Sequence, residues 1–364
     1  MTIGILGGGQ LGRMLILAGI PLGLRFRVLD PVREAATDGL AERVTGEFED
    51  FAALAEFVPG LDAVTYEFEN VPVATTEWLA ERVPVFPPPA ALAIAQDRIA
   101  EKQFFTSLQI PTPAYRAVSD RGSFDAAIVG IGLPAVLKTR RFGYDGKGQA
   151  VIRHRDEIEP AWSALAGRPL ILEQFMPFER ELSIIAVRER SGTTAFYPLS
   201  ENEHHQGILA RSIAPALGIE RGLQSTAESH ATRALTELHY VGVLAIEFFD
   251  VAGRLVANEM APRVHNSGHW TIEGAATSQF ENHVRAVAGW PLGTTEANGV
   301  SAMLNLIGDL PETANALEVP GTHLHLYGKA PRPRRKVGHI TITAADREQL
   351  MERVNRCRAI LAAT

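Results

Sequence analysis

The sequence predicts an α/β protein of two or three domains that begins with a Rossmann-like parallel β-sheet. The chain has 364 residues, more than a single hydrophobic core usually covers. Up to about residue 85, short apolar segments alternate with helical ones, which is the pattern of βαβ units. The first unit contains Gly7, Gly9 and Gly12 in the spacing G-x-G-x-x-G, which is typical of a turn that binds phosphate at a helix N-terminus.

The N-terminal segments follow one another in a regular order. We expect strands over residues 2–6, 25–30 and 63–69, and helices over residues 12–20 and 51–58. The proline-rich segment 84–92 cannot continue either kind of element and ends a first domain, residues 1–90. Taken alone, the glycine turn and Asp30 at the end of the second strand favour NAD as the ligand.

A second domain is expected over residues 91–293. It begins with a helix over residues 91–108, which the prolines that follow bring to an end. Two apolar strands joined by a glycine-rich turn occupy residues 134–152, and such a hairpin is typical of a covering flap. We expect this flap to belong to a flexible lid at about residues 110–172.

The later part of that domain predicts a β-rich core. Two strands in residues 170–189 precede an amphipathic helix that starts near residue 225, and a strand hairpin spans residues 244–264. A change in composition then begins a small C-terminal domain, residues 294–364, which carries the basic run 328–339.

Composition argues against several classes of protein. A hydrophobic content of 46% and a charged content of 21% are typical of soluble globular proteins, and a formal net charge of −7 argues against general nucleic-acid binding. The apolar stretch 14–24 is too short and too interrupted to span a bilayer, and residues 1–9 lack the basic start of a signal peptide. The single cysteine, Cys357, cannot form an internal disulfide. We therefore expect a cytoplasmic protein without membrane or nucleic-acid partners.

Two acidic residues in apolar strands indicate a cation site. Glu247 and Glu259 lie on the two strands of the predicted hairpin, and buried carboxylates are costly without a partner. Hard oxygen ligands that leave room for phosphate oxygens favour Mg²⁺. A pair of solvent-facing acids on an ordinary amphipathic hairpin explains the same pattern, and the residues alone leave both readings open.

Polar residues directly after the second acid suit an oxyanion. Arg263, His265 and Asn266 supply the donors that a phosphoryl or carboxylate intermediate needs. His265 and His269 have the i, i+4 spacing of zinc ligands, but the segment between them contains Gly and Ser and no third ligand is evident, so we do not expect zinc.

The predicted flap supplies a second phosphate-binding pattern. Lys138 ends an apolar strand, and Gly143, Gly146 and Gly148 follow it. These glycines allow the backbone to approach phosphate closely, although their order is not that of a Walker P-loop. An ordinary hairpin turn would account for the glycines but not for the polar residues crowded among them, Tyr144, Asp145 and Lys147.

Six segments together resemble the ATP-grasp superfamily. They read AQDRIAEKQFF from residue 95, VLKTRRFGYDGKGQ from 136, LEQFMPFERELS from 172, NEHHQGIL from 202, IEFF from 246 and NEMAPRVHNSGHW from 258. Within that superfamily the chain is similar, over nearly its whole length, to the N5-carboxyaminoimidazole ribonucleotide synthetases.

The resemblance implies a fold and an activity. The fold would be an ATP-grasp fold with an N-terminal Rossmann-like domain and a small C-terminal domain that closes the substrate site. The activity would be that of an ATP-dependent carbon–nitrogen ligase of de novo purine biosynthesis, which carboxylates 5-aminoimidazole ribonucleotide with bicarbonate through carboxyphosphate. Relatives of this kind use Mg²⁺, with Mn²⁺ as the alternative ion, and are commonly homodimers.

The resemblance also implies a nucleotide site. Arg98 and Lys138 would contact phosphates, Glu181 would hold the ribose hydroxyls, and His204 would lie near the nucleotide. Glu247 and Glu259 would bind the metal. The lid would be Gly143, Tyr144, Asp145, Gly146, Lys147 and Gly148, and the remaining contacts would be the hinge Glu173, Gln174, Phe175 and Met176 together with Asn258.

A ribonucleotide site is implied at the N-terminal domain, where the glycine turn would bind the 5′-phosphate of aminoimidazole ribonucleotide instead of NAD. Backbone N–H groups at a helix N-terminus bind phosphate whatever molecule carries it. Either Glu67 or Glu69 would face the ribose or base, and the basic tail would close the phosphate pocket. The residues implied are Gly8, Gly9, Gln10, Leu11, Lys329, Arg335 and Lys336.

Three positions depart from the family pattern. Phe142 and Arg334 each stand where many relatives place glycine, which leaves the entry to the lid and the phosphate ligands of the tail open. Ala261 stands where more distant ATP-grasp enzymes carry an Asn metal ligand, so only two carboxylate ligands are expected.

Chemistry at the centre would run through carboxyphosphate held near Arg263, His265 and Asn266. Asp145 would take the proton of the substrate amine, while Tyr144 and Lys147 would orient the base or the intermediate. The competing hypotheses are a formate-using ATP-grasp transformylase, an NAD-dependent dehydrogenase and a nucleotide-sensing protein with a degenerate site.

Overall fold

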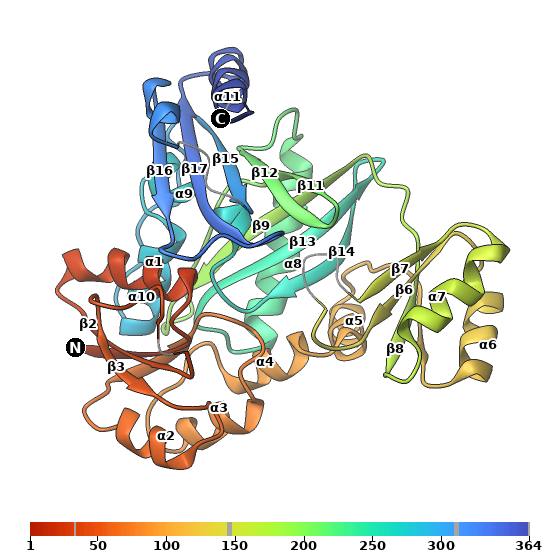
Figure 1. The fold of residues 1–364 in the computed structure, drawn as a ribbon, viewed down its shortest axis with the longest axis horizontal. Coiled ribbons are helices and arrows are strands. Elements are labelled where there is room, and N and C mark those ends of the chain that lie inside the picture. Colours follow the sequence, from red (N-terminus) through yellow and green to blue (C-terminus); the bar gives the residue numbers. More distant parts are fainter. Residues whose placement is uncertain (33, 144–147, 309–312, 363–364) are drawn as a thin grey trace.

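The computed structural model describes residues 1–32, 34–143, 148–308 and 313–362. Within these ranges the strands form three sheets, and Figure 1 shows them as three lobes around a common centre. No helix in the described ranges has both the length and the apolar character needed to cross a bilayer.

The N-terminal sheet is parallel and has the order β3-β2-β1-β4. Its strands are β1 (Thr2–Leu6), β2 (Arg25–Asp30), β3 (Glu42–Thr45) and β4 (Ala63–Tyr66). The helices of this region are α1 (Gln10–Gly19), the 3₁₀ turn η1 (Ile20–Leu22), α2 (Phe51–Phe57) and α3 (Val73–Ala80). The expected alternation of strands and helices is therefore confirmed, and β3 is an additional strand.

The predicted helix over residues 91–108 is wrong in one respect, because it is two helices. Helix α4 (Pro89–Ala95) ends before Gln96, and α5 (Arg98–Ser107) starts anew. The Asp97 carboxylate caps α5 by accepting the N–H of Ile99 at 2.9 Å. Gln96 donates its side-chain amide to the carbonyls of Glu69 and Val71 and so ties the break to the N-terminal domain.

The region predicted to act as a lid contains a small antiparallel sheet of order β5-β8-β6-β7, covered by two helices. Lys138 on β6 pairs with Gln149 on β7, which confirms the predicted flap hairpin. The elements are β5 (Tyr115–Val118), α6 (Arg121–Ile131), β6 (Ala135–Thr139), β7 (Gln149–Ile152), η2 (Arg155–Glu157), α7 (Ile158–Leu165) and β8 (Leu170–Gln174).

The central sheet has the order β14-β13-β9-β11-β12-β15-β17-β16, with β10 paired to β9. Its strands are β9 (Arg180–Arg188), β10 (Thr194–Phe196), β11 (Ser200–His205), β12 (Ile208–Ala214), β13 (Gly242–Val251), β14 (Arg254–Ala261), β15 (Val300–Ile307), β16 (Thr322–Leu326) and β17 (Lys336–Ala344). The C-terminal strands thus continue the sheet of the preceding domain, since β15 pairs with β12.

Helices cover this sheet and bury its apolar side chains. They are α8 (Arg221–Glu237), α9 (Thr271–Gly274), α10 (Gln279–Ala288) and α11 (Arg347–Ala362), with the 3₁₀ turns η3 (Asn266–Gly268) and η4 (Thr313–Glu318). Strands β13 and β14 lie near the centre of the molecule, between the other lobes (Figure 1).

Candidate active site

A cavity of about 900 Å³ lies where the three lobes meet. Nearly all of the predicted site residues line it, although they come from segments far apart in the sequence. Those in its wall are Gln10, Leu11, Glu67, Glu69, Arg98, Lys138, Gly143, Glu173, Gln174, Phe175, Met176, Glu181, His204, Glu247, Asn258, Glu259, Arg263, His265, Asn266, Lys329, Arg335 and Lys336.

Some predicted residues do not belong to that wall. Gly8, Gly9 and Gly148 are not among the residues that line the cavity. Four residues of the predicted lid fall outside the described ranges, namely Tyr144, Asp145, Gly146 and Lys147, and their roles stay predictions.

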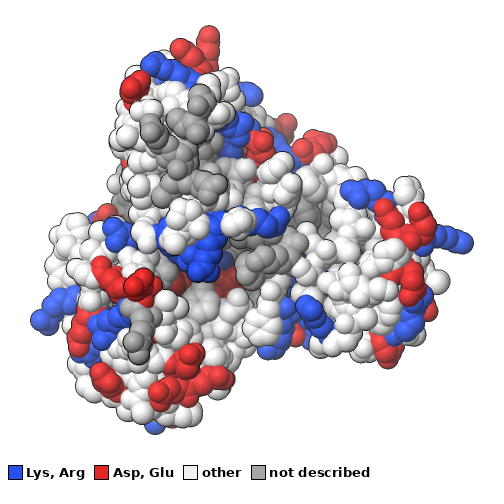
Figure 2. All heavy atoms as spheres, viewed as in Figure 1, with Lys and Arg blue, Asp and Glu red and all other residues white. Residues whose placement is uncertain are grey.

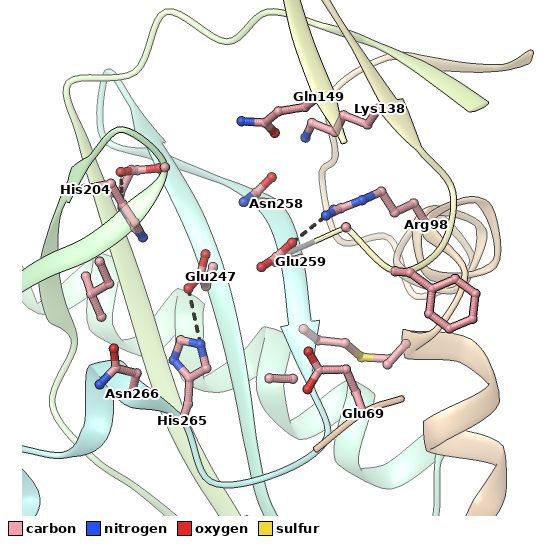
Figure 3. A pocket seen from close by; sticks show the side chains of 18 of the residues that line it. Glu69, Arg98, Lys138, Gln149, His204, Glu247, Asn258, Glu259, His265 and Asn266 are labelled. Carbon is pink, nitrogen blue, oxygen red and sulfur yellow. Dashed lines mark hydrogen bonds and ion pairs between the residues drawn. The ribbon is translucent and has the colours of Figure 1, made fainter. Parts of the chain in front are cut away.

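The two predicted metal ligands face each other at the centre of the cavity. Glu247 on β13 and Glu259 on β14 are direct partners in the antiparallel register (Figure 3). Burial and the neighbouring Glu259 raise the pKa of Glu247 to about 7. Burial alone would also raise the pKa of Glu259, but the Arg98 guanidinium, with its Nη1 3.0 Å from Glu259 Oε2, lowers it. Both carboxylates line the cavity, and the Glu259 side chain is 40% exposed there, so their role as metal ligands stays a prediction.

A β-bulge shapes the strand that carries Glu259. The register shifts so that Glu247 pairs with Glu259 but Phe248 pairs with Ala257, which leaves Asn258 as the extra residue. The Asn258 Oδ1 atom is buried and accepts no hydrogen bond from the described residues. Such an acceptor at the cavity wall is available to a ligand.

Sequence reasoning missed two charged residues of helix α5 that hold this bulge. The Lys102 side chain is fully buried, and its Nζ donates to the carbonyl of Asn258 and lies 3.9 Å from Glu173 Oε1. Glu101 Oε1 accepts the N–H of Met260 at 2.6 Å. Arg98, Glu101 and Lys102 share one helix face by their i, i+3, i+4 spacing, which is the signal that would have found them.

Glu173 was predicted to lie beside adenine, but its carboxylate lies between two lysine side chains. Its side chain is buried, and Glu173 Oε2 accepts a hydrogen bond of 2.8 Å from Lys138 Nζ. Burial would raise the pKa of Glu173, but Lys102 and Lys138 hold it at about 2. The carboxylate thus fixes the position of the lysine predicted to contact phosphate.

The predicted ribose acid and the predicted nucleotide histidine are in direct contact. His204 Nδ1 lies 2.6 Å from Glu181 Oε2 across β11 and β9. Burial would lower the pKa of His204, but the Glu181 carboxylate raises it above its usual value. The pair lies on the side of the cavity opposite Arg98 (Figure 3).

The two candidate acids of the N-terminal domain have different partners. Glu69 forms an ion pair with the Arg263 guanidinium at the cavity wall. Burial would raise the pKa of Glu69, but Arg263 holds it at about 2. Glu67 accepts the N–H groups of Gly9 at 2.5 Å and Gly12 at 2.8 Å, so it caps α1.

The glycine turn is therefore partly occupied by the protein itself. Gly8 N–H donates to Asp30 Oδ2 at 2.6 Å, and Gly9 N–H donates to Glu67. In this conformation the protein itself thus takes up the N–H groups of Gly8 and Gly9, and their binding to phosphate stays a prediction. Gln10 and Leu11 remain, because the N–H groups of the first helical residues have no intrahelical acceptor and both residues line the cavity.

Replacing Gly7 with Ala is expected to lower the free energy of unfolding by about 2 kcal/mol or more. Gly7 has φ of +100°, and a Cβ there would lie 2.6 Å from Glu67 Cγ, so strain and a clash add up. Gly23→Ala is the matched control, because Gly23 has φ of +77° with no heavy atom within 4 Å of its Cβ position. Urea unfolding of both variants measures the difference, and equal losses would contradict this account.

Basic residues of the C-terminal segment close the cavity above the glycine turn. Figure 2 shows Lys and Arg side chains gathered at the centre of this face. Lys329 Nζ donates to Gln10 Oε1 at the start of α1, and Arg335 and Lys336 line the same cavity. This brings together the two halves of the predicted phosphate pocket.

The two glycine departures keep a glycine-like backbone. Phe142 has φ of +60° and Arg334 has φ of +64°, both in the left-handed region that glycine favours. Arg334 Nη2 donates to the Gln206 carbonyl at 3.2 Å, in the turn after β11. The entry to the lid and the tail therefore keep the path that glycine allows, in spite of the larger side chains.

His265 and Asn266 are held from several sides. Burial and the Arg263 charge lower the pKa of His265 to about 3, so the ring is neutral. His265 Nε2 lies 3.5 Å from Glu247 Oε1 (Figure 3). The Asn266 amide exchanges two hydrogen bonds, of 3.1 and 2.6 Å, with Asn305 of β15.

Comparison with known proteins agrees with this arrangement. Family models match in three successive parts: the ribonucleotide synthetase preATP-grasp domain over residues 1–96, the ATP-grasp domain over residues 103–280, and the phosphoribosylaminoimidazole carboxylase C-terminal domain over residues 301–353. The N5-carboxyaminoimidazole ribonucleotide synthase of Pseudomonas aeruginosa is 52% identical over 100% of both chains. The protein of that name from Brucella melitensis is 48% identical over 93% of this chain and 95% of its own.

Solved structures give the same result. The N5-carboxyaminoimidazole ribonucleotide synthetase of Thermus thermophilus superposes with a TM-score of 0.95 at 56% identity, covering 99% of this chain and 98% of its own. The synthase of Aspergillus clavatus, in complex with ADP and 5-aminoimidazole ribonucleotide, superposes with a TM-score of 0.93 at 30% identity, covering 100% and 99%.

Proposed function

The chain belongs to the N5-carboxyaminoimidazole ribonucleotide synthase family of ATP-grasp ligases, and from this premise we propose how its residues carry out the reaction. The activity is the ATP-dependent carboxylation of 5-aminoimidazole ribonucleotide in purine biosynthesis. The NAD interpretation of the opening motif is wrong, because the chain belongs to this family of ATP-dependent ligases, whose N-terminal domain is a ribonucleotide synthetase domain. In this structure Asp30 accepts the N–H groups of Gly8 and Val32. The family assignment likewise replaces the transformylase and sensor hypotheses.

The observation that carries the proposal is the facing pair Glu247 and Glu259. The pair lies in one cavity with the residues predicted to bind ATP and with those predicted to bind the 5′-phosphate of the ribonucleotide. Arg98 and Lys138 lie on one side of the pair. Arg263, His265 and the N-terminus of α1 lie on the other. ATP and the ribonucleotide can therefore approach the same centre from opposite directions.

The donor set fits Mg²⁺. Among the described residues no group of three or more His, Cys, Asp or Glu gathers as a closed metal site. Glu247 and Glu259 instead supply two hard oxygen ligands. Burial first, and repulsion by Glu259 second, raise the pKa of Glu247, and a divalent cation between the two acids would favour the charged form of both. The remaining positions suit phosphate oxygens and water, as is usual for Mg²⁺. When bound, the ion would neutralise charge that develops on the transferred phosphoryl group.

In the first step, a bicarbonate oxygen attacks the γ-phosphorus of ATP, and the bond to the ADP oxygen breaks. Arg98 and Lys138 offset the negative charge of the phosphates during this transfer. Glu173 keeps Lys138 in place through its 2.8 Å hydrogen bond. The products of this step are carboxyphosphate and ADP.

In the second step, carboxyphosphate splits into CO₂ and phosphate beside Arg263, His265 and Asn266. The substrate amine attacks the carbon of CO₂ and transfers a proton to Asp145. Water must be kept from this step because carboxyphosphate hydrolyses readily, and we assign that role to the predicted lid, residues 143–148. Gln10, Leu11, Lys329, Arg335 and Lys336 hold the 5′-phosphate of the ribonucleotide meanwhile.

Phosphate release from Mg·ATP tests the function. The assay is run in bicarbonate buffer and in CO₂-depleted buffer, each with and without aminoimidazole ribonucleotide, and once with formate in place of bicarbonate. Release is expected to depend on both bicarbonate and the ribonucleotide. Release that needs formate, or that ignores the ribonucleotide, would contradict the proposal. Sedimentation of the same sample tests the expected homodimer.

Asp145→Asn is expected to lower carboxylation by about 10²-fold, because the amide cannot accept the amine proton. Binding of ADP, measured by calorimetry, should change by less than about threefold, since the amide keeps the size and polarity of this lid residue and loses only the acceptor for the amine proton. Asp125→Asn on α6 is the matched control, because its side chain is 56% exposed and pairs only with Arg121 in the described structure. Unchanged turnover in Asp145→Asn would remove it from the mechanism.

A further inference from the structure

A continuous row of buried polar side chains leads through the central sheet to the His265 ring. Ser212 on β12, Asn202 on β11 and Ser183 on β9 lie side by side across neighbouring strands, and Ser267 in η3 follows. The three serines are fully buried, and Asn202 is 7% exposed. Ser267 Oγ lies 2.8 Å from His265 Nδ1, at the end of the row. Ser183, Asn202 and Ser267 fall within the segments that carry the family resemblance, but the mechanism above assigns no role to them or to Ser212.

The contacts along the row form an unbroken chain of hydrogen bonds. Ser212 Oγ lies 2.7 Å from Asn202 Oδ1, and Asn202 Nδ2 lies 3.0 Å from Ser183 Oγ. Ser183 Oγ in turn lies 2.7 Å from Ser267 Oγ. Hydroxyls and an amide can share such a chain in either of two directions, because each hydroxyl both donates and accepts.

One backbone group favours one of the two directions. The N–H of Ser267 points at His265 Nδ1, at 3.3 Å, and a backbone N–H can only donate. This contact favours Nδ1 as an acceptor, and the Ser267 hydroxyl, 2.8 Å from Nδ1, then directs its proton there as well. The Ser183 hydroxyl must then donate to Ser267 Oγ, and the Asn202 amide must donate to Ser183 Oγ. The Asn202 carbonyl oxygen is left to accept from Ser212, which agrees with the geometry.

The His265 main chain is fixed as firmly as its ring. Gln279, which is fully buried on α10, accepts the His265 N–H on Oε1 at 3.0 Å and donates from Nε2 to the His265 carbonyl at 2.7 Å. Because both main-chain groups and Nδ1 are committed, the ring has one orientation. Its Nε2 lies 3.5 Å from Glu247 Oε1 and faces the cavity.

We propose that Ser183, Asn202, Ser212 and Ser267 are positioning residues that hold His265 in the tautomer with its proton on Nε2. His265 then serves as a hydrogen-bond donor to the oxygens of the bicarbonate-derived intermediate, not as a base that removes a proton. The second statement rests on the proposed function, whereas the tautomer depends on the chain alone. In a buried network in which every polar group has a hydrogen-bond partner, the direction of the hydrogen bonds is fixed, and few substitutions are tolerated.

The tautomer is measured directly by long-range proton–nitrogen NMR on ¹⁵N-histidine-labelled enzyme without ligands. A His265→Gln spectrum identifies the signals of this ring. The expected result is a neutral His265 with hydrogen on Nε2. A neutral ring with hydrogen on Nδ1 would overturn the proposal.

Asn202→Asp tests the chain by reversing it. An aspartate at this position accepts from both Ser212 and Ser183, which turns each later hydroxyl around and requires a proton on Nδ1. We expect the Nε2–H tautomer signature to be lost and kcat for carboxylation to fall by about 10²-fold, as for other residues that fix a histidine tautomer. The KM for ATP should stay within about threefold, because none of the four side chains lines the cavity.

Ser301→Ala is the matched control. Ser301 lies fully buried on β15 of the same sheet, and its Oγ has no hydrogen-bond partner among the described residues. Its removal should leave both the tautomer and kcat unchanged. If Asn202→Asp does not fold, Ser183→Ala replaces it, since loss of the Ser183 donor frees the Ser267 hydroxyl and should give a mixture of tautomers.

The outcomes separate this inference from the proposed function. If Asn202→Asp or Ser183→Ala keeps the Nε2–H tautomer and the kcat of Ser301→Ala, the positioning role is wrong while the carboxylase activity stands. If the wild-type enzyme releases no phosphate with bicarbonate and ribonucleotide, the proposed function is wrong, and the NMR result still decides the tautomer.

Discussion

Glu259→Gln is expected to lower the rate of carboxylation by about 10³-fold while the protein stays folded. Glutamine keeps the size of the side chain but removes the charge that faces Glu247 across the register and pairs with Arg98 at 3.0 Å. Losing a group that stabilises charge in the transition state typically costs two to three orders of magnitude, or about 3 to 4 kcal/mol. The measurements are ADP formation and the binding of Mn²⁺ to the enzyme·ADP complex, followed by electron paramagnetic resonance.

The matched control is Glu42→Gln in β3, whose side chain is 61% exposed and pairs with Arg27 away from the cavity. It should retain full activity and full Mn²⁺ binding. A Glu259→Gln enzyme that binds Mn²⁺ as tightly as the wild type would show that the metal lies elsewhere. Turnover within about tenfold of the wild type would contradict the role of Glu259 itself.

Arg263→Met is expected to cost about 3 to 5 kcal/mol of the free energy of unfolding at neutral pH. The substitution leaves the Glu69 carboxylate without its ion-pair partner inside the cavity wall. Activity should be lost as well, because the arginine is assigned to the carboxyphosphate intermediate. Urea unfolding and the carboxylation assay measure the two effects separately.

The double variant Arg263→Met/Glu69→Gln separates charge from catalysis. Removing the unpaired carboxylate should restore most of the stability but none of the activity. If the double variant is as unstable as the single one, the ion pair is not the cause. If it regains activity, Arg263 has no role in the reaction.

The same pair predicts a pH dependence. In the wild type the pKa of Glu69 is held at about 2, below the value of about 4.5 expected in the unfolded chain. Its contribution to stability is therefore complete above about pH 4.5 and is lost as the pH falls toward 2. In the double variant this part of the acid sensitivity should be absent.

The sequence predicted the helices and strands whose pattern of apolar residues matches the side chains that are buried in the structure. Strands β1 and β4 are mostly apolar and buried on both faces, and β2 alternates arginine with apolar residues before its buried end, so their patterns identified them. Strand β3 was missed because only Val44 of its four residues is buried. The helix break at Asp97 was missed because a capping aspartate inside an apolar helix is visible only once its N–H partners are known.

In the candidate site, too, the sequence predicted the residues with an unusual local pattern and missed those whose role depends on tertiary packing. Glu247 and Glu259 stood out because a carboxylate in an apolar strand is unusual in any sequence. Lys102 did not, since a lysine on a helix usually reaches solvent, and only the packing of α5 against β14 shows that this one is buried. The use of Glu67 to cap α1 was also beyond the sequence, because it depends on how β4 ends beside the glycine turn.

The continuity of the central sheet limits how this enzyme can be recombined with its relatives. Strand β15 pairs with β12, and Asn305 on β15 binds Asn266 of the active centre. A chimaera joined between residues 293 and 300 would take β15 from one enzyme and β12 from the other. Side chains that did not evolve together would then meet beside the reacting groups. A chain cut at that point would expose β12 as an open edge, the kind of surface that pairs with other chains and aggregates. The C-terminal segment is thus a part of the catalytic sheet and cannot be exchanged as a separate domain.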